Sequence, residues 1–249
     1  DEALVLRTID GSAVGQKRVP KLTNRWATYG RNILAWDTAS IRIDGKSRLA
    51  RSVWLADAWT DEELWKSTYT RDARGVVFDE DKVAIFEPAD GMLQVISLKD
   101  GKQLLTQHLP QAPNNVEHIV VRSVNGQLMV MLNEVHKSQR TSAQPPVATN
   151  AIANGMLYAV RNDGELLWPS PVVLDRYYFV EHQPIHSPVW VFHRVGQTNL
   201  KSAKRYYSVL AIDIRNGRPL LDEHLTAAQQ RPMTCSVVGD RHEVTLDFA

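Results

Sequence analysis

Apolar and polar residues alternate along most of this sequence in short runs, which are separated by Asp-Gly and Asn-Gly pairs. Residues 156–160, for example, precede Asp163-Gly164 and then the apolar pair Leu167-Trp168. Period-two alternation bounded by such pairs predicts β-hairpins. We expect type I′ turns, in which both central residues have positive φ, because Asp-Gly and Asn-Gly favour that turn.

The same unit of strand, turn and large apolar pair recurs five times along the chain. Its turns fall at residues 10, 60, 100, 163 and 216, and the residues left at the two ends make up one further step. Each step spans about 50 residues and contains a second strand pair, which is the size and content of a four-stranded propeller blade. The pattern predicts an all-β chain that forms one domain over 1–249, a β-propeller of about five antiparallel blades.

The two ends of the sequence carry complementary halves of the unit. Labelling the strands of a blade a to d outward from the axis, residues 4–7 begin on strand c, and residues 235–238 and 242–245 supply strands a and b. We therefore expect the two ends to complete one shared blade. The alternation at 244–248 stops within a motif, so we expect a piece of a longer protein. A β-sandwich is the alternative, but it accounts for the alternation and not for the five recurrences.

Composition and charge narrow the functional classes. Among 249 residues, 29 are basic, 28 are acidic and 43% are hydrophobic, which is typical of a globular protein and excludes a disordered chain. No run reaches the roughly 18 apolar residues of a membrane-spanning helix. Cys235 is the single cysteine, which excludes an internal disulfide; we expect it to be a small buried apolar residue.

The recurring unit resembles the repeat of quinoprotein-type propellers, a family that includes pyrroloquinoline-quinone dehydrogenases and the outer-membrane assembly lipoprotein scaffold. The matching residues are Asp57 with Leu64-Trp65, Asp163-Gly164 with Leu167-Trp168, and Asp213 with Asn216-Gly217. The resemblance covers nearly the whole chain, and the chain looks most like the propeller region of large planctomycete proteins with such repeats. It implies a bacterial protein in the periplasm or another extracytoplasmic compartment.

The departures from that family bear on the cofactor. Only Trp65 and Trp168 occupy the repeat's tryptophan position. Quinone-using members have seven or eight blades and hold the cofactor against a vicinal disulfide, which a chain with Cys235 alone cannot form. No calcium-binding cluster of Glu, Asn and Asp is readable either. We therefore expect a relative without a cofactor or a metal.

Candidate catalytic chemistry is sparse. No phosphate-binding loop, zinc-protease motif or serine-hydrolase motif occurs. Five-bladed propellers also include glycoside hydrolases, which use two carboxyl groups; Asp37, Glu87 and Glu134 follow strands b and are the candidates for this alternative. Carboxylates that simply form turns are the other interpretation. Trp36-Asp37 is the single Trp-Asp pair, which disfavours a WD-repeat propeller.

Histidine and tryptophan residues have structural interpretations as well. We expect His182, His186 and His193 to be surface or half-buried residues near a loop, because Pro184 interrupts the helical spacing that a metal pair would need. Five tryptophans are expected to lie in strands and to pack between blades, whereas Trp59 and Trp26 are expected to be exposed. The five are Trp36, Trp54, Trp65, Trp168 and Trp190.

Charge is the best functional indication in the sequence. We predict that the connections on one face of the propeller, the top face, include residues 38–51, 71–75, 170–179 and 195–205. All connections on this face together hold 15 basic and 8 acidic residues, while the rest of the chain holds 14 and 20. Long loops on one face are where such folds bind. We expect a monomeric, non-catalytic scaffold that binds a protein or an acidic or glycan ligand here, without nucleic acid. The candidate residues are Arg42, Lys46, Arg48, Lys137, Arg140, Lys201, Lys204 and Arg205.

Overall fold

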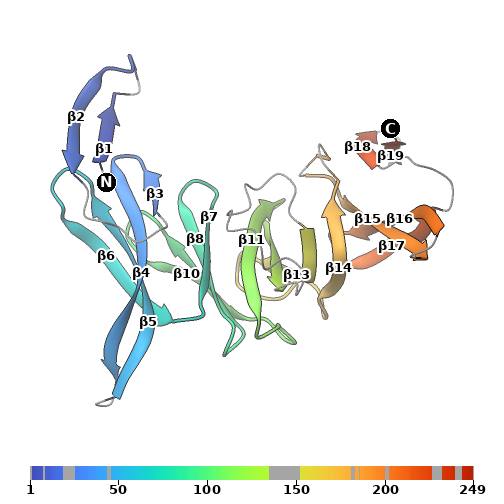
Figure 1. Cartoon of the computed structure of the whole chain (residues 1–249), viewed down its shortest axis with the longest axis horizontal. Helices are drawn as coiled ribbons and strands as arrows, with labels where there is room; N and C mark the ends of the chain where they lie inside the picture. The colour runs from blue at the N-terminus through green and yellow to red at the C-terminus, as the bar shows by residue number, and fades with distance from the viewer. Residues whose placement is uncertain are drawn as a thin grey trace. The chain divides into compact units, whose positions relative to one another are not determined.

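The computed structural model describes an all-β protein. The residues that it describes are 2–7, 9–18, 26–43, 46–134, 152–180, 183–184, 186–199, 202–225, 232–238 and 243–248. Every element in these ranges is a strand or a turn, and the paired strands are antiparallel (Figure 1). The chain divides into two compact units, residues 1–106 and residues 107–249. Each unit is described by itself below.

Unit 1 contains one hairpin and two four-stranded sheets, and in each sheet consecutive strands are neighbours. This order is the architecture of a propeller blade. The hairpin is β1 (Glu2–Leu6) and β2 (Ala13–Arg18). The first sheet is β3 (Trp26–Tyr29), β4 (Asn32–Ile43), β5 (Lys46–Asp57) and β6 (Glu63–Thr70). The second is β7 (Arg74–Phe78), β8 (Lys82–Glu87), β9 (Met92–Ser97) and β10 (Gln103–His108).

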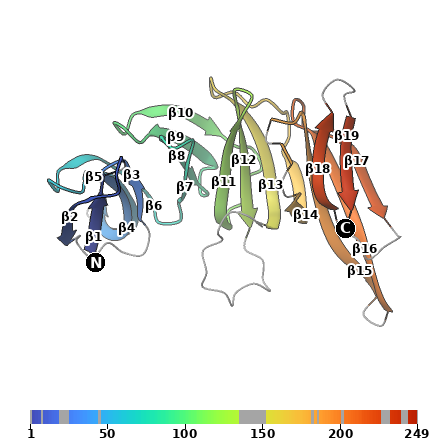
Figure 2. The ribbon, with the colours of Figure 1, turned by 90° about the horizontal axis from the view of Figure 1, so that it is seen from above.

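Unit 2 contains a seven-stranded meander and a second hairpin. The meander, seen from above in Figure 2, runs in chain order from β11 to β17. Its strands are β11 (Val116–Val124), β12 (Gln127–Glu134), β13 (Ile152–Arg161), β14 (Val172–Phe179), β15 (Val189–Asn199), β16 (Ser202–Asp213) and β17 (Arg218–Leu225). The hairpin is β18 (Pro232–Val238) and β19 (Glu243–Phe248).

The recurring turn of the sequence is a recurring structure in all five copies. In each copy one residue adopts positive φ, and the Asp, Asn or Thr before it accepts a hydrogen bond from the backbone N–H of the residue after it. The residues with positive φ are Gly11, Asp61, Gly101, Gly164 and Gly217. The acceptors are Asp10, Thr60, Asp100, Asp163 and Asn216, at 2.9 to 3.4 Å from the donor nitrogen. The repeat is therefore built into the backbone as well as the sequence.

The expected type I′ geometry is wrong for these five turns. In four copies the residue with positive φ donates its N–H to the carbonyl four residues earlier, as Gly101 does to Ser97 at 2.9 Å. This is a wider turn in which only the last residue needs positive φ, so the Asp before it keeps ordinary backbone angles. Type I′ angles occur instead at Asn125-Gly126, where both residues have positive φ.

Within each unit, the tryptophan that follows one recurring turn packs on the glycine of the next recurring turn. In unit 1, Trp65 Nε1 donates to Leu98 O at 2.8 Å, and a Cβ added to Gly101 would lie 2.7 Å from the Trp65 side chain. In unit 2, Trp168 Nε1 donates to Ile214 O at 3.1 Å, and a Cβ on Gly217 would lie 2.7 Å from Trp168. Glycine is required because the indole lies directly on the backbone.

The hairpin at the start of unit 1 makes a reversed contact, in which the glycine lies on the strand and the tryptophan lies in the turn. Gly15 stands on β2 where the other copies have Trp or Leu, and Trp59 in the turn after β5 covers it. A Cβ on Gly15 would lie 2.5 Å from the Trp59 ring. Trp59 is 50% exposed, as expected, and Trp65, Trp168 and Trp190 are buried; Trp36 and Trp54 are half-buried. The side chain of Trp26 lies outside what the structure describes.

One predicted strand position is wrong. Leu167-Trp168 was expected on a strand and residues 170–179 on a connection, but Trp168 lies outside a strand and β14 occupies Val172–Phe179. Pro169 and Pro171 explain the shift, because proline has no N–H for a strand ladder. The ladder with β13 therefore starts at Leu157↔Val172, and the end of β14 also pairs with β15 at Phe179↔Phe192.

The closing of one blade by both ends is not confirmed. β1 and β2 form a two-stranded sheet of their own, and β18 and β19 form another. The blade number and the single domain likewise remain predictions. Each unit has its own core: Leu34, Leu55, Val83 and Leu98 are buried in unit 1, and Met129, Leu157, Phe192 and Ile212 are buried in unit 2.

Candidate functional site

Two long β-hairpins, one in each unit, carry most of the basic residues that the sequence singled out. The sequence predicted the connections 38–51 and 195–205 as loops. Both are instead extended strands: β4 and β5 pair over their full length from Asn32↔Asp57 to Ile43↔Lys46. β15 and β16 pair from Val189↔Asp213 to Asn199↔Ser202. We call the outer parts the β4–β5 arm (38–43 and 46–49) and the β15–β16 arm (195–199 and 202–206).

Among the residues that the structure describes, the β4–β5 arm is a two-stranded ribbon on which no other strand pairs. β3 pairs with β4 only as far as Ala35, and β6 pairs with β5 only from Ala50 onward. Figure 1 shows the free end of β4 and β5 standing out from the rest of the four-stranded sheet. Its tip is therefore held by the ladder between its own two strands and by few side-chain contacts, such as the hydrogen bond between the hydroxyls of Ser40 and Ser47.

One face of the β4–β5 arm carries two arginines and three hydroxyl groups. Residues paired across an antiparallel ladder share a face, and residues two apart on one strand do as well. The pairs Thr38↔Arg51 and Arg42↔Ser47 therefore lie on one face. Arg42 and Ser47 are exposed and Arg51 is half-buried at the base of the arm. The pair between them, Ser40↔Leu49, lies on the same face, so two guanidinium groups and three hydroxyls share this face with one exposed leucine. The guanidinium and hydroxyl groups are of a kind that binds anions.

The predicted binding residues are only partly placed. Arg42, Lys46 and Arg48 lie on the β4–β5 arm, and Lys204 and Arg205 lie on the β15–β16 arm. Lys137, Arg140 and Lys201 lie outside the described residues, so their predicted place on the same face stays a prediction. The sequence identified the charges of these segments, but it missed that they are strands.

The carboxylates of the alternative enzymatic interpretation have local structural partners. Asp37 Oδ1 accepts the N–H of Thr38 at 2.6 Å, and Glu87 Oε1 accepts the N–H of Thr70 at 2.9 Å. Glu134 ends β12 in the other unit. For Asp37 and Glu87 the geometry therefore fits the interpretation that these carboxylates cap backbone groups.

Two other aspartates are held as anions at equivalent turn positions. Asp57 and Asp213 both end a strand, and both side chains are 5% exposed and paired with arginine, Asp57 with Arg31 and Asp213 with Arg215. The N–H of Trp59 lowers the pKa of Asp57, with Arg31 contributing; the Arg215 side chain lowers the pKa of Asp213. These carboxylates stabilise their turns. Both occupy the Asp position of the repeat that the recurring unit resembles.

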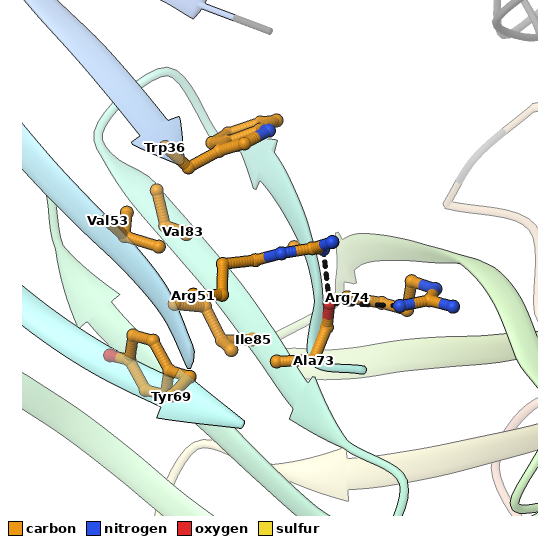
Figure 3. Close-up of a pocket in the computed structure, with 9 residues that line it drawn as sticks. Trp36, Arg51, Val53, Tyr69, Ala73, Arg74, Val83 and Ile85 are labelled. Atoms are coloured by element: carbon orange, nitrogen blue, oxygen red, sulfur yellow. Dashed lines mark hydrogen bonds between the residues drawn. The ribbon is translucent and has the colours of Figure 1, made fainter. Parts of the chain in front are cut away.

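A small cavity lies inside unit 1 at the base of the β4–β5 arm. Its volume is about 20 Å³, roughly the space for one water molecule. Trp36, Val53 and Val83 form apolar parts of its wall, and Arg51 and Arg74 form its charged part (Figure 3). Both arginines donate to Ala73 O, Arg51 at 2.5 Å and Arg74 at 3.3 Å. Both arginines belong to connections predicted on the top face, but no pattern in the sequence indicated that their side chains converge.

A larger and more open cleft lies in unit 2. It has a volume of about 430 Å³ and is lined by Pro169, Pro171, Tyr177, Pro219 and neighbouring residues. Tyr177 is buried, and the Arg194 guanidinium lies 4.9 Å from its ring centroid. Pro169 and Pro171, which interrupt the ladder, both line this cleft. Its polar lining residues are Ser170, Tyr177, Asn216 and Asp222.

The histidines give no metal site within the described part of the chain. No group of three or more His, Cys, Asp and Glu side chains there could hold a metal ion. His186 is exposed, His193 stacks on Tyr178 with ring centroids 5.4 Å apart, and His182 lies outside the described residues. Cys235 lies on β18, but its side chain is not described. Across the described ranges, no helix is long and apolar enough to cross a membrane.

Comparison with known proteins gives structural neighbours and no sequence relative. No protein-family model matches the sequence, and no curated protein matches it either. Among solved structures, BamB from Moraxella catarrhalis matches with 12% identity and a TM-score of 0.36, over 95% of this chain and 61% of its own. KlHsv2 with loop 6CD replaced by a Gly-Ser linker matches with 8% identity and a TM-score of 0.49, over 99% of this chain and 76% of its own.

A third neighbour is the β-propeller domain of the Trilobed protease from Pyrococcus furiosus. It matches with 7% identity and a TM-score of 0.43, over 91% of this chain and 67% of its own. This chain thus spans about three fifths of BamB and two thirds of the protease domain. Because all three TM-scores lie below 0.5, the fold described above rests on the sheets and turns of this chain itself.

Proposed function

We propose that this chain is a non-catalytic binding module, a five-bladed quinoprotein-like propeller whose basic β-arms bind an acidic protein partner. The arms are the observation that carries the proposal. Between residues 38 and 51 the sequence has four basic residues and one acidic residue, and between 195 and 205 it has three basic residues and no acidic one. A chain with a net charge of +1 concentrates positive charge on these two elements.

The shape of the β4–β5 arm also supports binding. A ribbon with few packing partners contributes little to a core, and no described strand pairs with the outer edges of this ribbon, so another chain can pair there. Basic residues on such a ribbon prevent its edges from pairing with copies of itself and attract an acidic partner. Salt screens exposed charges over about 8 Å at physiological ionic strength, so this attraction weakens as salt is added.

Charge reversal on the arms tests this function. The variants are Arg42→Glu with Arg48→Glu in unit 1 and Lys204→Glu with Arg205→Glu in unit 2. The control is Lys99→Glu with Arg161→Glu, two exposed residues next to the recurring turns. Each pair changes the net charge equally. Binding of an acetylated, amidated oligoglutamate peptide is measured at low and physiological salt.

We expect each arm variant to weaken oligoglutamate binding by about tenfold or more, since each converts attraction into repulsion. The control pair should change binding by less than about twofold. Sulfated polysaccharide and anionic phosphatidylglycerol vesicles serve as competing probes. If one of the competing probes binds the wild type and the peptide does not, the ligand belongs to the class of that probe and not to acidic proteins. If all arm variants bind the peptide as the wild type does, the arms are not the binding site.

The shared fifth blade belongs to the same proposal. If β1 and β2 join β18 and β19 in one sheet, the amide hydrogens on the joined edge exchange slowly, as those of central strands do. Fast exchange along both β1 and β19 would contradict a closed blade without affecting the role of the arms.

A further inference from the structure

The sequence contains three Asn-Gly pairs, and each lies in a different backbone environment. Asn125-Gly126 is the two-residue turn between β11 and β12, Asn154-Gly155 lies within β13, and Asn216-Gly217 belongs to the recurring turn between β16 and β17. Asparagine is a chemically labile residue, most of all before glycine, which has no side chain to shield its backbone nitrogen. The dipeptide is the same in all three, so a large difference in reactivity comes from the fold.

The reaction of such a pair is a ring closure followed by hydrolysis. The backbone nitrogen of the glycine loses its proton and attacks Cγ of the asparagine; a new C–N bond forms, the bond from Cγ to Nδ2 breaks, and Nδ2 leaves as ammonia. Water then opens the five-membered succinimide at either of its two carbonyl groups. The products are aspartate and isoaspartate, and overall one water is consumed for each ammonia released.

The turn at Asn125-Gly126 leaves the reacting groups outside the sheet. The β11–β12 ladder ends at Val124↔Gln127, so the Gly126 nitrogen lies beyond its last pair. Both turn residues are exposed, and water therefore reaches them. Asn125 Nδ2 donates to His186 O at 3.4 Å, which is longer than an ordinary hydrogen bond. Departure of this nitrogen as ammonia thus breaks only a weak contact.

The type I′ geometry of this turn is one peptide flip away from the conformation that closes the ring. A succinimide holds ψ of its asparagine near the value of the first residue in a type II′ turn. Types I′ and II′ share positive φ at that residue, here 50° at Asn125, and differ in the orientation of the central peptide. Glycine accepts both signs of φ at the second position. Both turns close a two-residue hairpin, so the flip leaves the ladder in place.

The recurring turn at Asn216-Gly217 engages the same groups in hydrogen bonds. The Gly217 N–H, which would be the nucleophile, donates to Asp213 O at 2.8 Å. Asn216 Nδ2 donates to Asp213 Oδ2 at 3.3 Å, and Asn216 Oδ1 accepts the N–H of Arg218 at 2.9 Å. Ring closure removes the proton of the first bond and the nitrogen of the second, so both bonds are lost. The turn that recurs along the chain therefore protects its asparagine.

The sheet itself holds the pair Asn154-Gly155. Gly155 is buried and pairs with Asn133 on one neighbouring strand and with Leu174 on the other. The Asn154 N–H donates to Asn133 Oδ1 at 2.9 Å. A Cβ added to Gly155 would lie 2.0 Å from Leu132 O, so the two backbones are in direct contact. The peptide between Asn154 and Gly155 has no room to flip.

We propose that Asn125 is a site of spontaneous deamidation and isoaspartate formation in the folded chain, whereas the fold protects the other two pairs. The modification affects a contact within unit 2. Gln127 follows the turn, and its Nε2 donates at 3.3 Å to Ile214 O, the carbonyl that also accepts the indole N–H of Trp168. Isoaspartate adds a carbon to the main chain of the turn as well as a negative charge. The pair Val124↔Gln127 then no longer closes in register, and the contact of Gln127 with Ile214 loosens.

The test follows all three sites in the full chain during incubation at neutral pH in water labelled with heavy oxygen. Peptide mass spectrometry measures the conversion of each amide and the uptake of label, and methylation by an isoaspartate methyltransferase measures isoaspartate. We expect Asn125 to react about tenfold or more faster than Asn154 and Asn216, the effect of about two hydrogen bonds. In urea the three sites should react at similar rates, because the fold no longer distinguishes them.

Two results would overturn the site. If Asn125 in the folded chain reacts as slowly as Asn216, the turn gives no access to the ring. If labelled aspartate forms at Asn125 without isoaspartate, water attacks the amide directly and no succinimide is involved.

Two variants separate the chemistry from its structural consequence. Asn125→Gln retains an amide but would need a six-membered ring, so its ammonia release should be too slow to detect over the same incubation; release at the wild-type rate would contradict the assignment to Asn125. Asn125→Asp has the charge of the product on an ordinary main chain, and aspartate tolerates positive φ. The Gln127 amide should exchange hydrogen slowly in Asn125→Asp and faster in wild type that contains isoaspartate. Equal exchange in the two would show that the added carbon does not open the turn.

Discussion

The contacts of Trp65 in unit 1 and Trp168 in unit 2 have the same chemistry in different surroundings. Each indole lies on a glycine of positive φ, Gly101 or Gly217, and donates to the carbonyl of a residue three positions before that glycine. Trp65 belongs to β6, whereas Trp168 is followed by prolines and lies outside a strand. The tryptophan contact therefore forms with or without a continuous outer strand.

This difference determines whether a cleft opens on the surface beside the indole. At Trp65 the ladder with β5 continues past the indole to Ala50↔Thr70. At Trp168 the ladder resumes only at Val172, and the cleft of about 430 Å³ opens beside Gly217. The comparison shows that the indole-glycine contact holds strand groups together, and that the residues after the indole decide whether the surface beside it is closed.

Removing the indole should have the largest effect. We expect Trp65→Ala and Trp168→Ala each to lower the free energy of unfolding by ~3–5 kcal/mol, because buried packing is lost and a cavity remains. The loss should be smaller at Trp168, since the segment after it is not held in a ladder and can relax into the gap. Urea unfolding followed by circular dichroism measures this. Trp→Phe at each site is the control for the lost N–H donor; an equal loss for Ala and Phe would show that the hydrogen bond, and not packing, carries the contact.

Filling the glycine should have the next largest effect. Gly101→Ala and Gly217→Ala place a methyl group 2.7 Å from the indole at a φ of 68° or 73°. The left-handed backbone costs ~1–2 kcal/mol for alanine, and overpacking adds ~1–3 kcal/mol. Gly11→Ala is the matched control, because Gly11 has a φ of 69° and nothing within 4 Å of the added Cβ. Thermal unfolding that shows the same loss at all three glycines would contradict a steric role of the indoles.

The aspartates of the two turns should show a pH-dependent effect. The pKa values of Asp57 and Asp213 are lowered from 3.8, so both carboxylates stabilise the folded chain at neutral pH. This stabilisation is present above the unfolded pKa and is lost as the pH falls through the lowered folded pKa. Asp57→Asn and Asp213→Asn should therefore be less stable than wild type at pH 7, and the difference should shrink below a pH of about 4.

Urea midpoints across that pH range measure this effect, with Asp100→Asn as a comparison at a more exposed turn. A constant difference between Asp213→Asn and wild type over the whole range would show that hydrogen-bond geometry, and not charge, stabilises this turn.

Replacing the prolines should have the smallest effect on stability and the clearest effect on structure. In a Pro169→Thr, Pro171→Val variant, backbone N–H donors return to the segment after Trp168, so the ladder with β13 can extend as it does after Trp65. Unfolding free energy should change by less than ~1 kcal/mol. Hydrogen exchange of residues 168–173 should slow, with Pro184→Ala, in an exposed position, as the control. Unchanged exchange would mean that the prolines are not the cause of the cleft.

Much of the fold could be predicted because its signals are local. Alternation and Asp-Gly or Asn-Gly pairs located the hairpins, and the recurrence at residues 10, 60, 100, 163 and 216 is a recurring turn in the structure. The turn type was predicted wrongly, since the distinction between type I′ and the wider turn depends on a hydrogen bond four residues away. The strand after Trp168 was also misplaced, although the signal, two prolines, stood in the sequence.

The candidate site was less predictable because its parts are distant in sequence. The basic residues of the arms are visible in the sequence. A basic loop and a basic two-stranded ribbon can have the same composition, however, so composition did not distinguish them. The convergence of Arg51 and Arg74 on Ala73 O depends on two strands from adjacent sheets meeting at one turn. No spacing in the sequence encodes such a meeting.

The sequence by itself determined the all-β class and the positions of the five turns, because each follows from backbone preferences over a few residues. Only the tertiary structure decided that Trp65 and Trp168 pack on Gly101 and Gly217, that Glu87 accepts the N–H of Thr70, and that Arg51 and Arg74 share the Ala73 carbonyl. Those features depend on packing between strands far apart in the chain, where the position of one side chain is set by neighbours that local preferences do not specify.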